Sequence, residues 1–180
     1  SGYDNRGVWW GKWYSTPSAY SAVASSSAIA NTVTETAFSK SYQIPAGIAN
    51  DAGMRIKVRA SGRYSNTGTP TLQIAIKLGS STFAVLPATP TPSGVSNYGW
   101  AIEGEAVVRT IGSSAEIQNG FCSGGILGGV YVGCAYTNNF TLNMTAAQTV
   151  SVLVQWGTAS SSNTAILDTL GVELVASGRH

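Results

Sequence analysis

The feature that most constrains this chain is a strict alternation between Met54 and Ala60, where every second residue is apolar and the three between are basic. Successive side chains of a β-strand point to opposite faces, so this segment has one apolar face and one cationic face. The same alternation recurs in residues 72–78 and, with acidic residues between the apolar ones, in residues 100–109. The chain is therefore predicted to be an all-β protein whose sheets each bury one face.

Turn residues divide the sequence into about ten short segments of this kind, a spacing typical of an antiparallel β-sandwich of the jelly-roll type. Gly, Pro, Asn and Ser cluster at the joints, for example in residues 45–47 and 66–70. We expect strands near residues 33–44, 54–64, 71–78, 81–86, 98–110, 114–121, 126–136, 139–144, 149–156 and 164–175. The expected inward side chains are Met54, Ile56, Val58, Leu72, Ile74, Ile76, Leu78, Trp100, Ile102, Val108, Val150, Val152, Val154 and Trp156.

The composition narrows the class of protein further. At 180 residues the chain is long enough for one domain with a full core. Only 10% of its residues are charged and the net charge is +2, which is too small a basic excess to predict nucleic-acid binding. No apolar stretch approaches the roughly 18–20 residues of a membrane helix, so membrane insertion is not predicted.

The first 30 residues differ from the rest and are interpreted as an extended N-terminal arm, with the sandwich over residues 31–180. The arm holds an aromatic cluster, Trp9, Trp10, Trp13 and Tyr14, followed by a Ser/Ala-rich segment that predicts a linker. Aromatic residues outside a core often mark interfaces. Three roles remain open for the cluster: packing against the chain's own body or a sister subunit, docking to a larger partner, and stacking on sugars. Because the chain begins with Ser1, we expect a processed product or a part of a longer chain.

The polar positions of two alternating segments form a candidate charge stripe of Arg55, Lys57, Arg59, Glu103 and Glu105. If the two strands are neighbours, the bases and acids lie side by side on the solvent face. Exposed cross-strand pairs contribute only about 0.2–1 kcal/mol each. The stripe is therefore expected to fix strand register or to meet the same stripe on another subunit.

Catalytic chemistry is not predicted. The one histidine, His180, is the last residue, which excludes a serine triad in practice. Glu103 and Glu105 share one strand face, as paired glycosidase acids can. The glycosidase pattern Glu-x-Asp-x-x-Glu is not completed, however, because residue 108 is Val. Two cysteines and one histidine do not build a four-ligand zinc site, so no metal or cofactor is expected.

Two further features leave alternatives open. Cys122 and Cys134 either close a disulfide loop or remain two half-buried thiols. The Gly-rich stretch 120–133 lacks the ending of a phosphate-binding loop and is interpreted as a long flexible hairpin. If the protein recognises a receptor, loops 87–97 and 120–133 at one end of the sandwich are the expected ligand-holding segments.

Several strand and turn signatures resemble a known family. They are Asn31 to Thr36, Tyr42 to Gly47, Ile56 to Leu72 (with its Tyr-Ser-Asn-Thr-Gly-Thr-Pro turn), Leu78-Gly79, Trp100 to Glu105 with Arg109 to Gly112, Val154 to Trp156, and Ser160 to Thr164. Over about residues 31–175 the sequence resembles the jelly-roll module of virion structural proteins of tailed bacteriophages.

The resemblance implies a non-enzymatic virion protein, of the capsid decoration, head-fibre or tail-fibre type. It implies a homotrimer whose N-terminal arm attaches it to other virion proteins, and it does not distinguish head from tail. The alternative is a receptor- or carbohydrate-binding β-sandwich module, whose partner would be a host-surface glycan.

Overall fold

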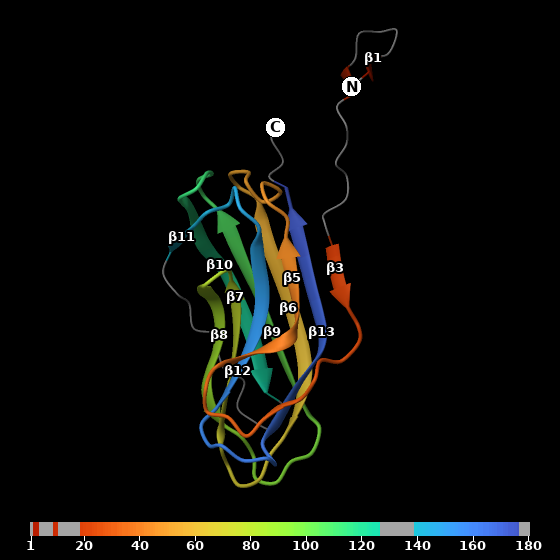
Figure 1. The fold of residues 1–180 in the computed structure, drawn as a ribbon, viewed down its shortest axis with the longest axis vertical. Helices are drawn as coiled ribbons and strands as arrows, with labels where there is room; N and C mark the ends of the chain where they lie inside the picture. Colours follow the sequence, from red (N-terminus) through yellow and green to blue (C-terminus); the bar gives the residue numbers. More distant parts are fainter. Residues whose placement is uncertain (1, 4–8, 11–18, 127–138, 177–180) are drawn as a thin grey trace.

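The chain is an all-β protein of two antiparallel sheets packed as a sandwich (Figure 1), as the alternation predicted. The computed structural model describes residues 2–3, 9–10, 19–126 and 139–176. Within them there is no helix long and apolar enough to cross a membrane. The strands are β1 (Gly2–Tyr3), β2 (Trp9–Trp10), β3 (Ala19–Ala22), β4 (Ile29–Ala30), β5 (Thr36–Ile44), β6 (Arg55–Ser65), β7 (Thr71–Leu78), β8 (Ser81–Pro90), β9 (Tyr98–Val108), β10 (Ala115–Ile126), β11 (Phe140–Leu142), β12 (Gln148–Trp156) and β13 (Thr164–Val175).

The strand order is that of a jelly roll. The larger sheet runs β11-β10-β9-β6-β13-β3, with β4 also pairing with β13, and the smaller sheet runs β5-β12-β7-β8. The chain crosses between the sheets several times, so that β3, β13, β6 and β9 form one four-strand unit facing β5, β12, β7 and β8. Strands β10 and β11 extend the larger sheet beyond β9.

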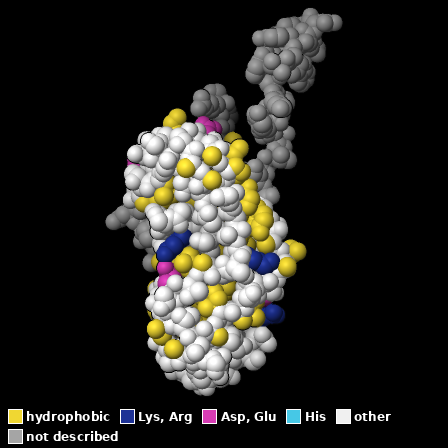
Figure 2. Space-filling view, in the orientation of Figure 1, with side chains coloured by type: hydrophobic (Ala, Val, Ile, Leu, Met, Phe, Trp, Pro, Cys, Tyr) yellow, Lys and Arg dark blue, Asp and Glu magenta, His cyan; other side chains and the backbone are white. Residues whose placement is uncertain are grey.

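The core lies between the two sheets and confirms the predicted inward residues. All fourteen of them, from Met54 to Trp156, are at most 8% exposed. Each large apolar side chain buried in this way contributes about 1.5–3 kcal/mol, far more than an exposed ion pair. The chain has few charged residues, and the face of the molecule drawn in Figure 2 accordingly shows few charged side chains.

The segment 19–31 differs from the predicted linker, because it is hydrogen-bonded to the sandwich. Strand β3 pairs with β13 as the edge of the larger sheet. Ser26 then donates its amide to the Leu167 carbonyl at 2.7 Å and accepts the Leu167 amide on Oγ at 3.1 Å. Tyr20 stacks on Tyr42 of the smaller sheet, with ring centroids 4.8 Å apart. An edge strand packs against a neighbour on one side only, so small Ser and Ala residues suffice and leave little sequence signal.

The described chain enters and leaves the sandwich at the same end. Ala19, the first residue of β3, lies opposite Glu173 near the end of β13. Arg55 lies opposite Val175, also at this end. The other end carries the turns that follow Ser65, Pro90 and Trp156 (Figure 1). The molecule therefore has a proximal end, where the termini of the sandwich lie, and a distal end.

Candidate functional site

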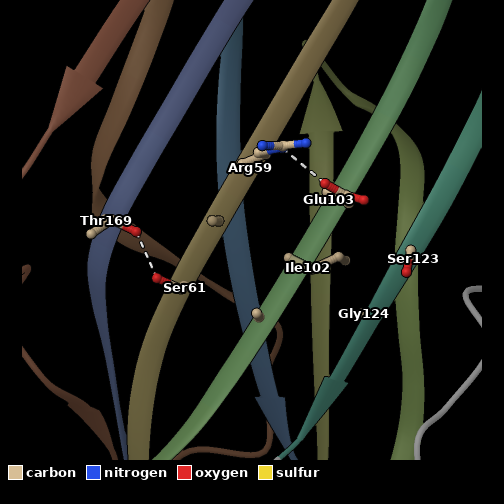
Figure 3. Close-up of a pocket in the computed structure, with 9 residues that line it drawn as sticks. Arg59, Ser61, Ile102, Glu103, Ser123, Gly124 and Thr169 are labelled. Carbon is tan, nitrogen blue, oxygen red and sulfur yellow. Dashed lines mark hydrogen bonds and ion pairs between the residues drawn. The ribbon is translucent and has the colours of Figure 1, made fainter.

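The predicted charge stripe forms on the outer face of the larger sheet, because β6 and β9 are neighbours. Lys57 lies opposite Glu105 and Arg59 opposite Glu103. Arg59 Nε is 2.9 Å from Glu103 Oε2 (Figure 3), and the Arg59 side chain is 83% exposed. Glu105 contacts two cations, Arg55 Nη1 at 3.0 Å and Lys57 Nζ at 3.9 Å. All five residues of the stripe thus meet within one chain.

Beside the stripe, a row of small side chains crosses four strands and forms a shallow groove of about 410 Å³. Strand register places Gly125 opposite Ala101, Ala101 opposite Ser61, and Ser61 opposite Thr169. The Ser61 and Thr169 hydroxyls lie 2.6 Å apart (Figure 3). The residues of these four strands that line the groove beside its ion-paired residues are Gly124 of β10, Ala101, Ser61 and Thr169, and we call them the groove floor.

Two ion pairs flank the groove floor. The Arg59–Glu103 pair lies on one side of the floor: Arg59 precedes Ser61 by two residues on β6, and Glu103 follows Ala101 by two residues on β9. Ser123 of β10 lies opposite Glu103. On the other side Arg63 follows Ser61, and its Nη2 is 3.6 Å from Asp168 Oδ1. The lining of the groove therefore includes one ion pair, Arg59–Glu103, and a floor of small side chains and hydroxyls, whereas the Arg63–Asp168 pair lies beside the floor and outside the lining.

Phe121 is an exposed aromatic residue next to the stripe, which the sequence analysis did not single out. It is 46% exposed and lies opposite Glu105. A shift of register between Asn119 and Phe121 marks a β-bulge in β10. Phe121 also lines a smaller hollow, of about 120 Å³, whose other walls include Arg59 and Glu103. The hollow and the groove therefore share this ion pair.

The first half of the Gly-rich stretch is part of a strand and not a loop. Residues 120–126 belong to β10, and residues 127–133 lie outside the described residues. Cys122, on the inward face of β10, is disulfide-bonded, so it is not one of two free thiols. The sequence holds one other cysteine, Cys134, which lies outside the described residues.

The predicted aromatic cluster is described only in part. Trp9 and Trp10 form β2, which pairs with β1 in the register Gly2 to Trp10 and Tyr3 to Trp9. Trp13 and Tyr14 lie outside the described residues. The role of the cluster therefore stays a prediction.

The distal end contains a buried polar network that the sequence analysis marked only as a turn. Asn66, 7% exposed, donates from Nδ2 to Thr91 Oγ1 at 2.5 Å and to the Pro92 carbonyl at 2.8 Å. Its Oδ1 accepts the Val95 amide at 2.9 Å. Nearby, the buried Asn163 accepts the Thr67 amide at 3.1 Å. These bonds hold three distal turns together.

Next to this network lies an aromatic cluster of two buried residues, Tyr64 and Trp156, and the more exposed Tyr98. The Tyr64 ring lies 6.2 Å from that of Trp156 and 6.3 Å, edge-on, from that of Tyr98. Burial, with a smaller contribution from Tyr98, raises the pKa of Tyr64 to about 12. The Tyr64 phenol is therefore neutral throughout the physiological range.

Among the described residues, no group of three or more His, Cys, Asp or Glu side chains is placed to hold a metal ion. The ionisable groups of the groove and stripe are instead arranged as pairs of opposite charge. Such an arrangement offers hydrogen-bond donors and acceptors side by side, which suits binding of an uncharged polar ligand.

Comparison with known proteins finds similarity among solved structures and not among sequences. The sequence matches no protein-family model and no curated protein. A solved structure of the CBM2 module of the evolved Dit of Lactobacillus casei BL23 phage J-1 aligns with 84% of this chain and 76% of its own, with 8% sequence identity and a TM-score of 0.36. Nothing about function follows from an alignment at this score.

Proposed function

We propose that the chain is a non-enzymatic structural protein of a bacteriophage virion, a capsid decoration, head-fibre or tail-fibre module. This proposal depends on one observation: residues 66–70, which carry part of the family resemblance, form an ordered turn at the distal end of the sandwich. Asn66, Gly68 and Pro70 form the distal turn, in which Gly68 has a φ of +66° and the Pro70 carbonyl accepts the Thr91 hydroxyl at 2.7 Å. The shared signature thus belongs to the jelly roll itself.

The path of the chain supports attachment through the N-terminal region. Strand β3 begins and strand β13 ends at the proximal end, so a module held by its N-terminal segment presents its distal end outward. We propose that Trp9, Trp10, Trp13 and Tyr14 contact other virion proteins or a sister subunit. Large aromatic side chains bury much area with little loss of conformational entropy, which suits such an anchor.

The geometry of Glu103 and Glu105 supports a role other than catalysis. Each carboxylate lies within 3.0 Å of an arginine side chain from β6. Oppositely charged residues at facing positions of neighbouring strands are a common surface arrangement that favours register. We therefore propose that these acids order the sheet face and do not cleave glycosidic bonds.

Attachment is tested with the full chain and a variant that lacks residues 1–18. This deletion leaves β3 and the rest of the sandwich in place. Phage particles that lack the protein are mixed with each purified chain and then re-isolated by density centrifugation. We expect the full chain to co-sediment and the variant to remain free. Equal co-sedimentation of both would refute anchoring by the N-terminal segment.

A homotrimer is proposed from the resemblance, and the solution mass tests it. Size-exclusion chromatography with light scattering is expected to give three times 18.6 kDa. The variant without residues 1–18 separates two roles of that segment. A monomeric variant assigns the segment to contacts between subunits, whereas a trimeric variant that fails to co-sediment assigns it to the anchor.

A second candidate function, recognition of a receptor or carbohydrate, is favoured by the groove. Its hydroxyls, its paired charges and the nearby Phe121 form a polar surface with one exposed aromatic ring. A virion protein can carry both functions, because attachment involves the proximal end and the groove lies on a sheet face.

A further inference from the structure

We propose that the groove on the outer face of the larger sheet binds a short, uncharged oligosaccharide. This inference rests on the second proposed function and names its site. The groove floor consists of Gly124, Ala101, Ser61 and Thr169, and the ligand lies across the strands along this row. Figure 3 shows Gly124, Ser61 and Thr169 on their three strands.

The dimensions of the floor fit a chain-like ligand. Four adjacent strands contribute one residue each, and strands lie about 4.8 Å apart, so the row is roughly 14 Å long. The volume of about 410 Å³ lies within the range of small-molecule sites. No large side chain interrupts the row, because its members are Gly, Ala, Ser and Thr. An extended ligand can therefore contact all four strands.

The chemistry of the walls favours hydroxyl groups as ligands. A sugar hydroxyl both donates and accepts hydrogen bonds, so it can pair with a guanidinium and a carboxylate at once. Arg59 supplies donors and Glu103 supplies acceptors, 2.9 Å apart on one wall. Arg63 and Asp168 repeat this combination beside the other edge of the floor, just outside the lining of the groove. Ser61 and Thr169 add hydroxyls at the floor between them.

The charge balance decides between ligand classes. The ion pair on each side of the floor has one cation and one anion, so a polyanion would meet Glu103 and Asp168, and a polycation would meet Arg59 and Arg63. Neither charged class gains a net attraction from these four residues, because each attraction is offset by a repulsion of similar size. An uncharged ligand meets no repulsion and uses all four groups.

Phe121 extends the site along β10. It precedes Gly125 by four residues on the same strand face, roughly 13 Å along the strand. Its hollow adjoins the groove through the shared Arg59 and Glu103. The apolar face of a sugar ring packs on an exposed aromatic ring, so a branch or second unit of the ligand is expected to stack there.

The test uses the full chain on an array of uncharged, acidic and amino oligosaccharides, followed by calorimetric titration of any ligand retained. The groove-filling variant is Ala101→Arg, which places a long side chain at an exposed position of the floor. The matched control is Ala37→Arg, at an exposed position of β5 on the other sheet. Thermal unfolding followed by circular dichroism establishes that both variants fold.

We expect the full chain to retain uncharged oligosaccharides. Ala101→Arg should weaken binding at least tenfold, Phe121→Ala about three- to tenfold, and Ala37→Arg less than twofold. Retention of acidic or amino oligosaccharides alone, no retention at all, or undiminished binding by folded Ala101→Arg would each overturn the proposal. Undiminished binding by Ala101→Arg would leave carbohydrate recognition standing and place it elsewhere. The co-sedimentation assay tests attachment to the virion, so its outcome does not depend on any of these oligosaccharide-binding results.

Discussion

Gly62 lies opposite Trp100 across β6 and β9, and the indole ring occupies the space that a side chain at residue 62 would need. A Cβ at residue 62 would lie 2.6 Å from the ring and 1.9 Å from the Ile166 carbonyl oxygen. Trp100 in turn stacks on Phe38 of the smaller sheet, with ring centroids 5.8 Å apart. The absence of a side chain at Gly62 therefore permits close packing both within the larger sheet and between the sheets.

The first prediction is that Gly62→Ala destabilises the fold by about 3 kcal/mol or more, since the clash involves backbone as well as a large ring. Urea unfolding followed by tryptophan fluorescence measures the change. Gly99→Ala is the matched control, because the nearest atom to a Cβ at residue 99 is 3.9 Å away. It should change stability by less than about 1 kcal/mol. Equal effects of the two substitutions would contradict the packing described here.

The second prediction concerns the buried amide of the distal end. Asn66→Ala removes the acceptor of the Val95 amide and the donor to Thr91 Oγ1 and the Pro92 carbonyl. A buried polar group left without a partner costs about 1–3 kcal/mol, so we expect a loss of about 2–4 kcal/mol. Ser93→Ala, at an exposed position of the 91–95 segment that Asn66 contacts, should be nearly neutral. A loss below 1 kcal/mol for Asn66→Ala would show that water replaces the amide.

The third prediction is a fall of stability at high pH. The pKa of Tyr64 is about 12 in the folded chain and near 10 in the unfolded chain. Between these values the unfolded state loses the proton that the folded state keeps, so stability is complete below pH 10 and decreases as the pH rises toward 12.

Urea unfolding at a series of pH values measures this decrease. Tyr64→Phe should reduce the slope between pH 10 and 12, because the phenol no longer titrates. Tyr42→Phe, which removes a half-buried phenol from the smaller sheet, should keep the slope that Tyr64 produces. An unchanged slope in Tyr64→Phe would show that other groups cause the alkaline loss.

The sequence was sufficient to predict the sandwich, the inward residues and the charge stripe, because period-two alternation fixes the face of every residue in a strand. The alternation placed Arg55, Lys57 and Arg59 on one face of a strand. It did not show which strand pairs with this one. The groove could not be predicted, because it depends on which strands are adjacent. Ala101 and Ser61 become one floor only through the pairing of β9 with β6.

Two other features left little trace in the sequence for different reasons. Strand β3 is a short edge strand with the sequence Ala-Tyr-Ser-Ala in a Ser/Ala-rich segment, so its composition resembles that of a linker. Phe121 is exposed in the middle of a strand, where the β-bulge after Asn119 shifts the register. Simple alternation does not anticipate such a shift, and the Gly-rich composition around Phe121 favoured a loop.

The fourth prediction concerns the charge stripe. Glu105→Gln removes the partner of Arg55 and Lys57, whose side chains are half exposed. The expected loss of stability is therefore no more than about 1 kcal/mol, and it should be smaller still in high salt. Glu116→Gln is the control, since Glu116 accepts a hydrogen bond from the Asn139 side-chain amide and forms no ion pair with another described residue. If Glu105→Gln lowered the free energy of unfolding by several kcal/mol, the prediction would be wrong and the stripe would contribute substantially to stability.

The last prediction separates the N-terminal segment from the first strand of the jelly roll. Deletion of residues 1–18 should leave the melting temperature nearly unchanged, because β3 still pairs with β13. Deletion of residues 1–30 also removes Tyr20 from its stack on Tyr42, both hydrogen bonds between Ser26 and Leu167, and the pairing of β4.

The longer deletion exposes the edge of β13, and we expect it to lower the melting temperature strongly and to promote aggregation. Differential scanning calorimetry and light scattering on the two truncated chains measure these effects. A control chain in which residues 1–18 are replaced by a Gly/Ser linker should match the shorter deletion. If the longer deletion were as stable as the shorter one, residues 19–30 would be a dispensable arm and not part of the sandwich.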